Sequence, residues 1–276
     1  MSSSCGTIDE QRAKQDVIIN ETLKQIKNKI LVMSGKGGVG KSSVAAYLSL
    51  FLAKKGHKVG LMDVDLHGPS IPRMLGITKG VQGSDSGKAL PVSVLPNLHV
   101  ISIEALMGED KDAALIWRGP VKIGVIRQFI SDIKWPELDY LIIDSPPGTG
   151  DEPLTVAQTI PDAKAIIVTT PQEVSLADVR KSINFCLHVK MKILGLVENM
   201  SGLTCPHCGK SIDLFKQGGG MTTALSHGLR LLATLPIEPE LVKMGDSGDF
   251  SNLKAENSPF AAEFKKLVEQ VEKLTA

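Results

Sequence analysis

One glycine-rich segment has the residue types that hold a nucleotide phosphate. Residues 35–42 read Gly-Lys-Gly-Gly-Val-Gly-Lys-Ser, which fits the phosphate-loop pattern G-x-x-x-x-G-K-[ST]. Glycines let backbone N–H groups turn toward a phosphate, and the helix expected after the segment points its positive dipole end at the same anion. Lys41 is expected to reach the β- and γ-phosphates, and the Ser42 hydroxyl to bind Mg²⁺. The residues predicted to line the nucleotide in this segment are Gly35, Lys36, Gly37, Gly38, Val39, Gly40, Lys41, Ser42 and Ser43.

A second lysine, Lys36, follows the first glycine of this phosphate loop. A second fixed cation can reach a phosphate from another direction, either in the same site or across a dimer. The residue types alone leave both arrangements open.

Carboxylates follow two of the expected strands, in positions that suit a metal ion or an attacking water. Residues 140–144 read Tyr-Leu-Ile-Ile-Asp, and Asp144 is expected to act on Mg²⁺ through its water shell. Asp63 and Asp65 follow another apolar run. Ligands of parallel sheets bind at the carboxyl ends of the strands, so Asp65, in the loop, is the candidate to orient water or to bind the metal shell. Asp63 fits either a functional role or a structural hydrogen bond.

A pair of cysteines indicates a second kind of chemistry. Cys205 and Cys208 are spaced C-P-H-C, which lets two thiolates reach one metal centre from a tight turn. Two thiolates are half of a four-ligand site, and the other cysteines, Cys5 and Cys186, do not form a second pair. Cys186 follows an apolar helix face, so we expect it to be a buried core residue.

A two-fold axis would complete the metal site, because two copies of the chain would bring four cysteines together. Such a set suits a [4Fe–4S] cluster or a tetrahedral zinc ion. These residues do not distinguish the two metals, and His207 is a candidate for an additional zinc ligand. A thioredoxin-like redox pair fits less well, because this C-x-x-C lies in a long loop and does not open a helix after a strand.

Apolar runs alternate with helical segments from residue 29 onward, and these elements must position the residues above. Several runs are apolar throughout, as in strands buried on both faces of a parallel sheet. The alternation predicts a doubly wound α/β fold, in which helices cover both faces of a mostly parallel sheet in three layers. The expected strands are Ile30–Ser34, Val59–Asp63, Leu98–Ser102, Tyr140–Asp144, Ala165–Thr169, Lys192–Val197 and Leu231–Leu235. The expected helices are Ser42–Lys55, Val121–Ile133, Pro153–Thr159, Ser175–His188 and Pro259–Leu274.

The chain divides into a leading helix and one large domain. Apolar residues at helical spacing predict an amphipathic helix over residues 8–27. We therefore expect an N-terminal helical extension over residues 1–28 and a single P-loop ATPase domain over residues 29–276. Residues 66–97 are rich in Gly, Pro and Ser and are predicted to form a long loop. Residues 201–220 are predicted to form the metal-binding loop around the cysteine pair.

The composition favours a cytoplasmic protein. Of the 276 residues, 42% are apolar and 22% are charged, which is ordinary for a globular domain. The formal net charge of +1 gives no global field that attracts nucleic acid or an anionic membrane. No apolar run approaches the roughly 20 residues of a membrane span, and the polar N-terminus does not resemble a secretory signal. We expect neither nucleic acid nor a membrane as a partner.

The extra lysine in K-G-G-V-G-K-S resembles the deviant Walker A motif of the MinD/ParA class of P-loop ATPases. Further motifs make the chain similar to the Mrp (ApbC-like) family, whose members are iron–sulfur cluster carriers and scaffolds that work as ATP-dependent homodimers. These motifs are DVDLHGPS at residues 63–70, WRGP at 117–120, DSPPGTGD at 144–151, ENMS at 198–201 and CPHC at 205–208. The resemblance extends from about residue 29 to the C-terminus.

The resemblance implies that the chain hydrolyses ATP with Mg²⁺ and holds a [4Fe–4S] cluster at a homodimer interface, through the C-P-H-C pair, for transfer to apoproteins. It implies that Lys36 meets nucleotide across the interface, that Asp65 is the hydrolytic residue and that Asn199 contacts adenine. The predicted catalytic set is therefore Lys36, Lys41, Asp65 and Asp144, of which the two aspartates join Ser42 at the Mg²⁺.

Other functions share parts of this pattern. The alternative is a MinD/ParA-type positioning ATPase with a structural zinc at the cysteine pair. Cycling on a membrane would need a basic amphipathic tail, whereas the last helix balances acidic and basic residues and is expected to pack on the domain. A nitrogenase-reductase-like electron donor holds its cluster with single, well-separated cysteines, which C-x-x-C does not resemble. Some family members carry an N-terminal four-cysteine motif, but only Cys5 precedes the phosphate loop here, so no second cluster is expected.

Overall fold

The computed structural model describes residues 3–65, 68, 70–78, 80–85, 87–104, 119–205, 208, 210–212, 214, 218–249 and 258–276. Eight strands form the main sheet: β1 (Ile26–Ser34), β2 (Val59–Asp63), β5 (Val92–Leu95), β6 (Leu98–Ser102), β7 (Leu138–Asp144), β8 (Lys164–Thr169), β9 (Lys192–Glu198) and β12 (Leu231–Thr234). Their order is β12-β9-β8-β1-β7-β2-β6-β5. All neighbours are parallel except the edge strand β5, which runs antiparallel to β6.

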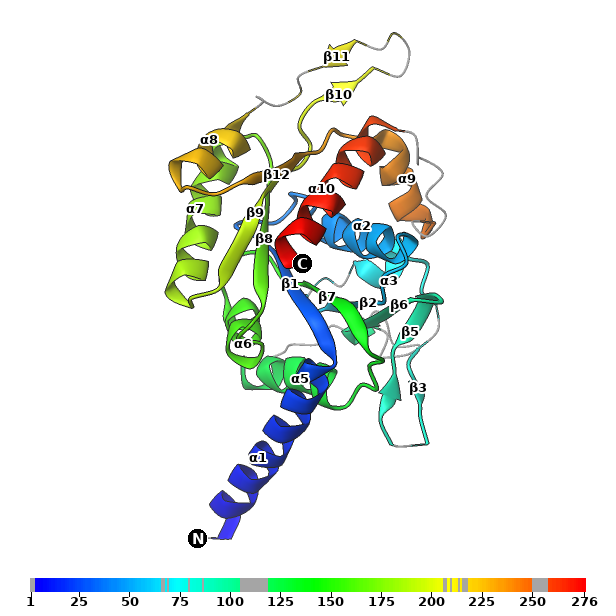
Figure 1. Cartoon of the computed structure of the whole chain (residues 1–276), viewed down its shortest axis with the longest axis vertical. Helices are drawn as coiled ribbons and strands as arrows, with labels where there is room; N and C mark the ends of the chain where they lie inside the picture. The colour runs from blue at the N-terminus through cyan, green and yellow to red at the C-terminus, as the bar shows by residue number, and fades with distance from the viewer. Residues whose placement is uncertain are drawn as a thin grey trace.

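Helices cover both faces of this sheet (Figure 1). One face carries α2 (Lys41–Lys54), α3 (Ile71–Met74), α9 (Pro239–Ser247) and α10 (Pro259–Thr275). The other face carries α1 (Ser3–Lys24), α5 (Gly119–Ser131), α6 (Asp151–Thr159), α7 (Glu173–His188) and α8 (Gly219–Ser226). Two short hairpins stand outside the main sheet, namely β3 (Gln82–Gly83) with β4 (Ala89–Leu90), and β10 (Leu203–Thr204) with β11 (Ser211–Ile212).

A hydrophobic core lies on each face of the sheet, where the strands pack against the helices. Along β1, Ile30 and Val32 belong to the core under α2 and α10, whereas Leu31 and Met33 belong to the core under α5 and α7. Successive side chains of a strand point to opposite faces, so a strand between two helix layers must be apolar at nearly every position. This arrangement confirms the predicted doubly wound α/β fold.

The first strand begins earlier than the sequence pattern predicts. Helix α1 ends at Lys24 and β1 begins at Ile26, inside the predicted helix. Ile26 is buried and pairs with Leu138 of β7, so burial in the sheet outweighs its helical spacing with the preceding residues. The predicted boundary at residue 28 therefore falls within β1, and the division into domains remains a prediction.

The segment predicted as a long loop contains regular structure. Between residues 66 and 97 the described parts include α3, the β3–β4 hairpin and β5. Strand β5 pairs antiparallel with the next strand, β6, through Val92 opposite Val100, a local pairing that the Gly- and Pro-rich composition does not reveal. The helices α8 and α9 are also absent from the predicted elements.

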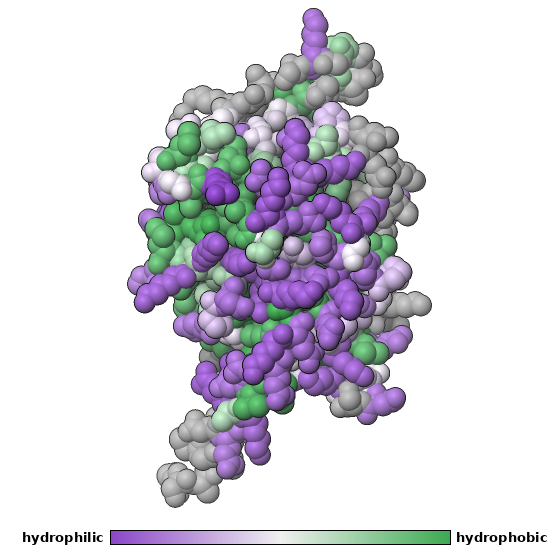
Figure 2. Space-filling model, viewed as in Figure 1, coloured by the Kyte–Doolittle hydropathy of each residue, from purple (hydrophilic) through white to green (hydrophobic). Residues whose placement is uncertain are grey.

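The ends of the molecule carry two projections. Helix α1 extends from one end and the β10–β11 hairpin from the other (Figure 1). Figure 2 shows apolar surface gathered over α7 and α8, where Leu187, Met221 and Leu225 are exposed. Among the described helices, none combines the length and the apolar character needed to cross a membrane.

Candidate nucleotide and metal sites

The phosphate loop connects β1 to α2, as predicted. Gly38 and Gly40 have φ angles of 77° and 78°, a conformation that favours glycine. At Gly40 a Cβ atom would lie 2.3 Å from the Asn199 Nδ2 atom, so any larger residue would collide with that amide. Gly40 directly precedes α2, whose unsatisfied N–H groups and positive dipole end favour an anion beside the loop.

The Lys41 side chain points toward the end of β7. Its Nζ atom lies 2.5 Å from Asp144 Oδ1 and 3.1 Å from Ser42 Oγ, and both Lys41 and Asp144 are buried. Because the Lys41 ammonium and the Asp144 carboxylate have opposite charges in a buried site, each offsets part of the desolvation cost of the other. Three of the residues predicted to act on phosphate and Mg²⁺, namely Lys41, Ser42 and Asp144, are thus brought together.

Two carboxylates stand side by side at the strand ends. Asp63 of β2 pairs in register with Asp144 of β7, and both Oδ2 atoms are buried without a hydrogen-bond partner. Burial raises the pKa of Asp63 well above its usual range, and the charge on Asp144 adds to this effect. Burial also raises the pKa of Asp144, although Lys41 and Ser42 oppose the shift. Unpartnered carboxylate oxygens beside a serine hydroxyl are the oxygen ligands that Mg²⁺ prefers.

Asp65 and Lys36 lie at the rim of the site. The Asp65 backbone N–H donates to Asp63 Oδ1 at 3.0 Å, and the Asp65 carboxylate is close enough to raise the pKa of Asp144. Lys36 Nζ donates to Gln172 Oε1 at 3.5 Å. Lys36 therefore contacts the loop after β8, whereas Lys41 contacts the carboxylates. Its predicted contact with nucleotide across a dimer remains a prediction.

Asn199 lies against the phosphate loop. Its Nδ2 atom donates to Val39 O at 2.9 Å, and it lines a cavity of about 290 Å³. The other walls of this cavity include Gly40, Tyr47, Met200, Ile237 and Phe260. Mostly apolar walls, two of them aromatic, with a few polar groups such as Asn199 and Glu238 suit a planar base, and the adenine contact remains a prediction. Met200 has φ 58°, an uncommon conformation for a residue other than glycine.

The cysteine pair lies in the β10–β11 hairpin, apart from the phosphate loop. Cys205 is half-buried and Cys208 is exposed, and Cys205 N–H donates to Lys210 O at 2.9 Å. Cys186 is fully buried in α7, where burial raises its thiol pKa to about 12, which confirms the prediction of a core residue. Within the described residues, no three or more Cys, His, Asp or Glu side chains are grouped to hold a metal ion.

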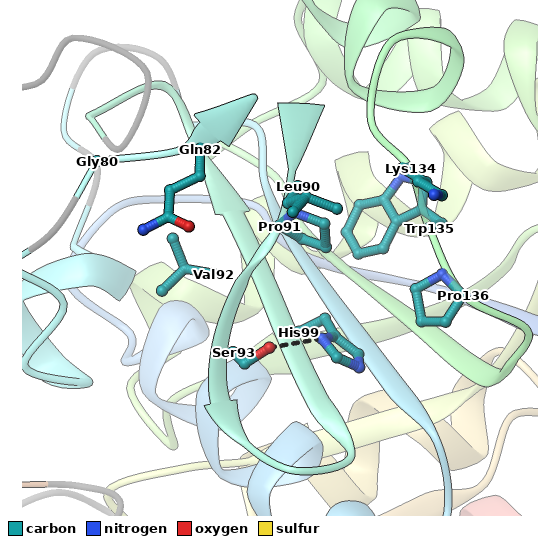
Figure 3. Close-up of a pocket in the computed structure, with 10 residues that line it drawn as sticks. All are labelled: Gly80, Gln82, Leu90, Pro91, Val92, Ser93, His99, Lys134, Trp135 and Pro136. Carbon is teal, nitrogen blue, oxygen red and sulfur yellow. Dashed lines mark hydrogen bonds between the residues drawn. The ribbon is translucent and has the colours of Figure 1, made fainter. Parts of the chain in front are cut away.

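Another cavity lies near the opposite ends of the parallel strands. It has a volume of about 520 Å³ and is lined by residues of the β5–β6 edge and by Trp135 and Pro136 before β7 (Figure 3). Ser93 Oγ lies 3.1 Å from His99 Nδ1 there, and burial lowers the pKa of His99. None of the predicted site residues lines this cavity.

Some predicted motif residues lie outside the described part of the chain. These are Leu66, His67, Pro69, Trp117, Arg118, Pro206 and His207. The structure gives Asp63 a hydrogen bond from the Asp65 backbone N–H to Oδ1 and leaves its buried Oδ2 atom without a partner. The sequence signal for its place in the site is its position at the end of an expected strand, whereas its pairing with Asp144 became visible only in the structure.

A strand, glycine loop and helix, with carboxylates at the ends of two neighbouring strands, define a P-loop nucleotide-binding protein. The family model described as "ParA: NUBPL iron-transfer P-loop NTPase" matches residues 25–272. The chain belongs to this family, which confirms the resemblance seen in its motifs.

Similar proteins cover nearly the whole chain. It is 44% identical over 270 residues to an iron-sulfur cluster carrier protein of Methanocaldococcus jannaschii, covering 98% of this chain and 92% of the relative. It is 48% identical over 244 residues to the cytosolic Fe-S cluster assembly factor CFD1 of Eremothecium gossypii, covering 85% and 86%. A nucleotide-binding protein of Archaeoglobus fulgidus, solved in complex with ADP, is 41% identical with a TM-score of 0.78, covering 90% of this chain and 96% of that one.

Proposed function

We propose that this chain is an ATP-hydrolysing iron–sulfur cluster carrier that passes its cluster to apoproteins. The observation that carries the proposal is the cysteine pair in a projecting hairpin, with Cys208 exposed to solvent while Cys186 is buried in the core. Thiolates at an exposed position can receive and release a cargo, which a closed structural metal site does not allow. The chain's family and its carrier-named relative support the same assignment.

The cluster itself is proposed to be [4Fe–4S], held by Cys205 and Cys208 of two copies of the chain. Two cysteines per chain are half of the set that such a cluster needs, and a two-fold axis supplies the other half. The proposed assembly is therefore a homodimer. We place it in the cytosol, in keeping with the name of the Eremothecium gossypii relative, with neither membrane nor nucleic acid as a partner.

The nucleotide half of the function is assigned to the phosphate loop. Lys41 would hold the β- and γ-phosphates, and Ser42 with Asp144 would hold Mg²⁺, which neutralises charge on the phosphates. Asp65 would orient the attacking water from the rim of the site. Lys36 is proposed to reach the nucleotide of the partner copy, and Asn199 to contact adenine. The ADP-bound Archaeoglobus fulgidus protein supports a nucleotide in this fold.

Anaerobic reconstitution with iron and sulfide tests the cargo assignment. The wild-type chain should take up about four iron and four sulfide ions per two chains and sediment as a dimer. Cys205→Ala and Cys208→Ala should each lose the cluster, because each removes one of the two thiolates per chain. Cys5→Ala is the matched control and should retain it.

Metal analysis of protein purified without oxygen separates the two metals. Iron together with acid-labile sulfide supports the proposal. Zinc without sulfide, or full clusters in both cysteine variants, would overturn it.

A further inference from the structure

A buried carboxylate at the end of β9 has no role in the functions assigned above. Glu198 is fully buried. Its Oε1 atom accepts a hydrogen bond from Ser201 Oγ at 2.7 Å and one from Gly218 N at 3.3 Å, and its Oε2 atom accepts one from Gly220 N. Burying a charge is costly unless donors surround it, and three donors converge here.

These donors come from the two ends of the cysteine loop, residues 201–220. Ser201 is its first residue, and Gly218 and Gly220 lie where the chain enters α8. Between them the β10–β11 hairpin carries Cys205 and Cys208 away from the domain (Figure 1). One carboxylate therefore joins both ends of the segment that presents the cysteine pair.

Glu198 also caps α8. The N-cap residue Gly218 has no side chain to satisfy the free N–H groups of the first turn, and a helix N-terminus favours a negative charge. At Gly220 a Cβ atom would lie 2.9 Å from both the Glu198 Cβ and Oε2 atoms. Only glycine at position 220 lets the first turn of α8 approach the Glu198 side chain this closely. The hydrogen bond from Gly220 N–H to the carboxylate therefore depends on the glycine.

We propose that Glu198 is a positioning residue for the cluster, because it fixes where the cysteine loop leaves and rejoins the domain. The inference rests on the function proposed above. A cluster shared by two chains needs four thiolates at fixed distances from the metal. A loop whose two ends are already fixed loses less conformational entropy when it binds. Glu198 thus favours retention of the cluster without contacting it.

Glu198→Gln tests this role with little change in shape. The amide has one accepting oxygen, so its NH₂ group must face either Gly220 N–H or the donors of Ser201 and Gly218. Loss of a hydrogen bond to a charged group should speed amide exchange in the β10–β11 hairpin and at the start of α8 by roughly tenfold. The reconstituted cluster should pass to an iron chelator faster by a similar factor.

Two further variants sharpen the experiment. Ser201→Ala removes only the donor at the first end of the loop and should give a smaller change in the same direction. Thr222→Ala is the matched control, since the Thr222 hydroxyl lies in the first turn of α8, donates to Gly218 O and is exposed. That control should exchange and release the cluster like the wild type.

The measurements separate this proposal from the proposed function. If wild-type protein takes up no iron and sulfide, the proposed function fails, while faster exchange in Glu198→Gln still shows that Glu198 fixes the loop. If the wild type holds a cluster and Glu198→Gln releases it at the same rate with unchanged exchange, the positioning role is overturned. ADP affinity should stay within about twofold of wild type. If Glu198→Gln lowers the ADP affinity and the melting temperature together with cluster retention, Glu198 is a general structural residue. That outcome would also overturn the proposal.

Discussion

Lys41 and Asp144 neutralise each other at the centre of the phosphate site, and a bound nucleotide would change this pairing. The Lys41 ammonium is held by Asp144 Oδ1 and Ser42 Oγ, and the second oxygen of Asp144 has no partner. Phosphate oxygens compete for the ammonium, since charge-assisted bonds to phosphate are strong. The carboxylate released in that exchange would need a cation, and a bound Mg²⁺ would supply one.

Replacing this lysine is expected to abolish tight nucleotide binding. Lys41→Ala removes the charged donor to the β- and γ-phosphates, so affinity for Mg-ATP should fall roughly 100-fold or more. It also leaves Asp144 buried without its cation, which lowers thermal stability. Titration calorimetry measures the affinity, and Lys54→Ala, on the exposed side of the same helix, is the control. Equal affinity in the two variants would contradict the role given to Lys41.

Among the elements, α10 stabilises the helix that follows the phosphate loop. Tyr47 of α2 makes edge contacts with Phe260 and Phe264 of α10, at centroid distances of 5.4 and 5.8 Å. The prediction that the last helix packs on the domain is thereby confirmed. At the other end of α10, Glu272 lies 2.5 Å from Lys55 Nζ and 2.8 Å from His57 Nε2, which ties α10 to the turn after α2.

The Glu272 contacts predict a pH-dependent contribution to stability. Partial burial raises the pKa of Glu272, but the bonds from Lys55 and His57 outweigh burial and hold it below its usual value of 4.5. Such a group stabilises the fold above that value, and the contribution is lost as the pH falls through the lowered pKa. Glu272→Gln should therefore lower the melting temperature at pH 7 by about 1–3 °C.

The difference should close at acid pH. At a pH well below the lowered pKa of Glu272, the wild type and Glu272→Gln are expected to melt together, because the carboxylate is then protonated in the folded state as well. Glu269→Gln, at an exposed position of the same helix, serves as the control. A gap that persisted or widened at low pH would show that the ion pair is not its origin.

Sequence reasoning succeeded where one residue pattern has one structural outcome. Strands β1 and β7 to β9 were predictable because continuous apolar runs fit a strand between two helix layers. Helix α8 was not, since its first residues are glycines, poor helix formers, and its cap is Glu198, about twenty residues earlier in the chain. The phosphate loop followed from its motif, whereas the converging donors around Glu198 became visible only in three dimensions.

At the scale of the whole molecule, the two proposed sites both call for a second copy of the chain. Lys36 contacts Gln172 rather than the carboxylates of its own site, and each chain offers one cysteine pair. A lysine at the rim can reach a nucleotide held by a facing copy. Binding of nucleotide and sharing of a cluster would then favour the same dimer.

Sedimentation velocity tests the part of Lys36 in this assembly. With Mg²⁺ and a non-hydrolysable ATP analogue, the wild type should shift from monomer to dimer. Lys36→Ala should remain monomeric while its nucleotide affinity stays within about threefold of wild type, because Lys41 still holds the phosphates. Lys243→Ala, an exposed lysine on α9, should behave like the wild type. Dimerisation of Lys36→Ala at wild-type concentrations would exclude the proposed contact.

Side chains alternate at the end of β9, so that one face of the sheet carries the contact with the cysteine loop and the other carries the contact with the phosphate loop. Leu196 and Glu198 face the layer of α7 and α8, whereas Val197 and Asn199 face the layer of α2. Adjacent positions on a strand point to opposite sides. Inserting a single residue in β9 would therefore turn the carboxylate toward the phosphate loop and the amide toward the cysteine loop. Inserting two residues would preserve both directions. The phosphate loop and the cysteine loop therefore depend on the same alternation of side chains along β9.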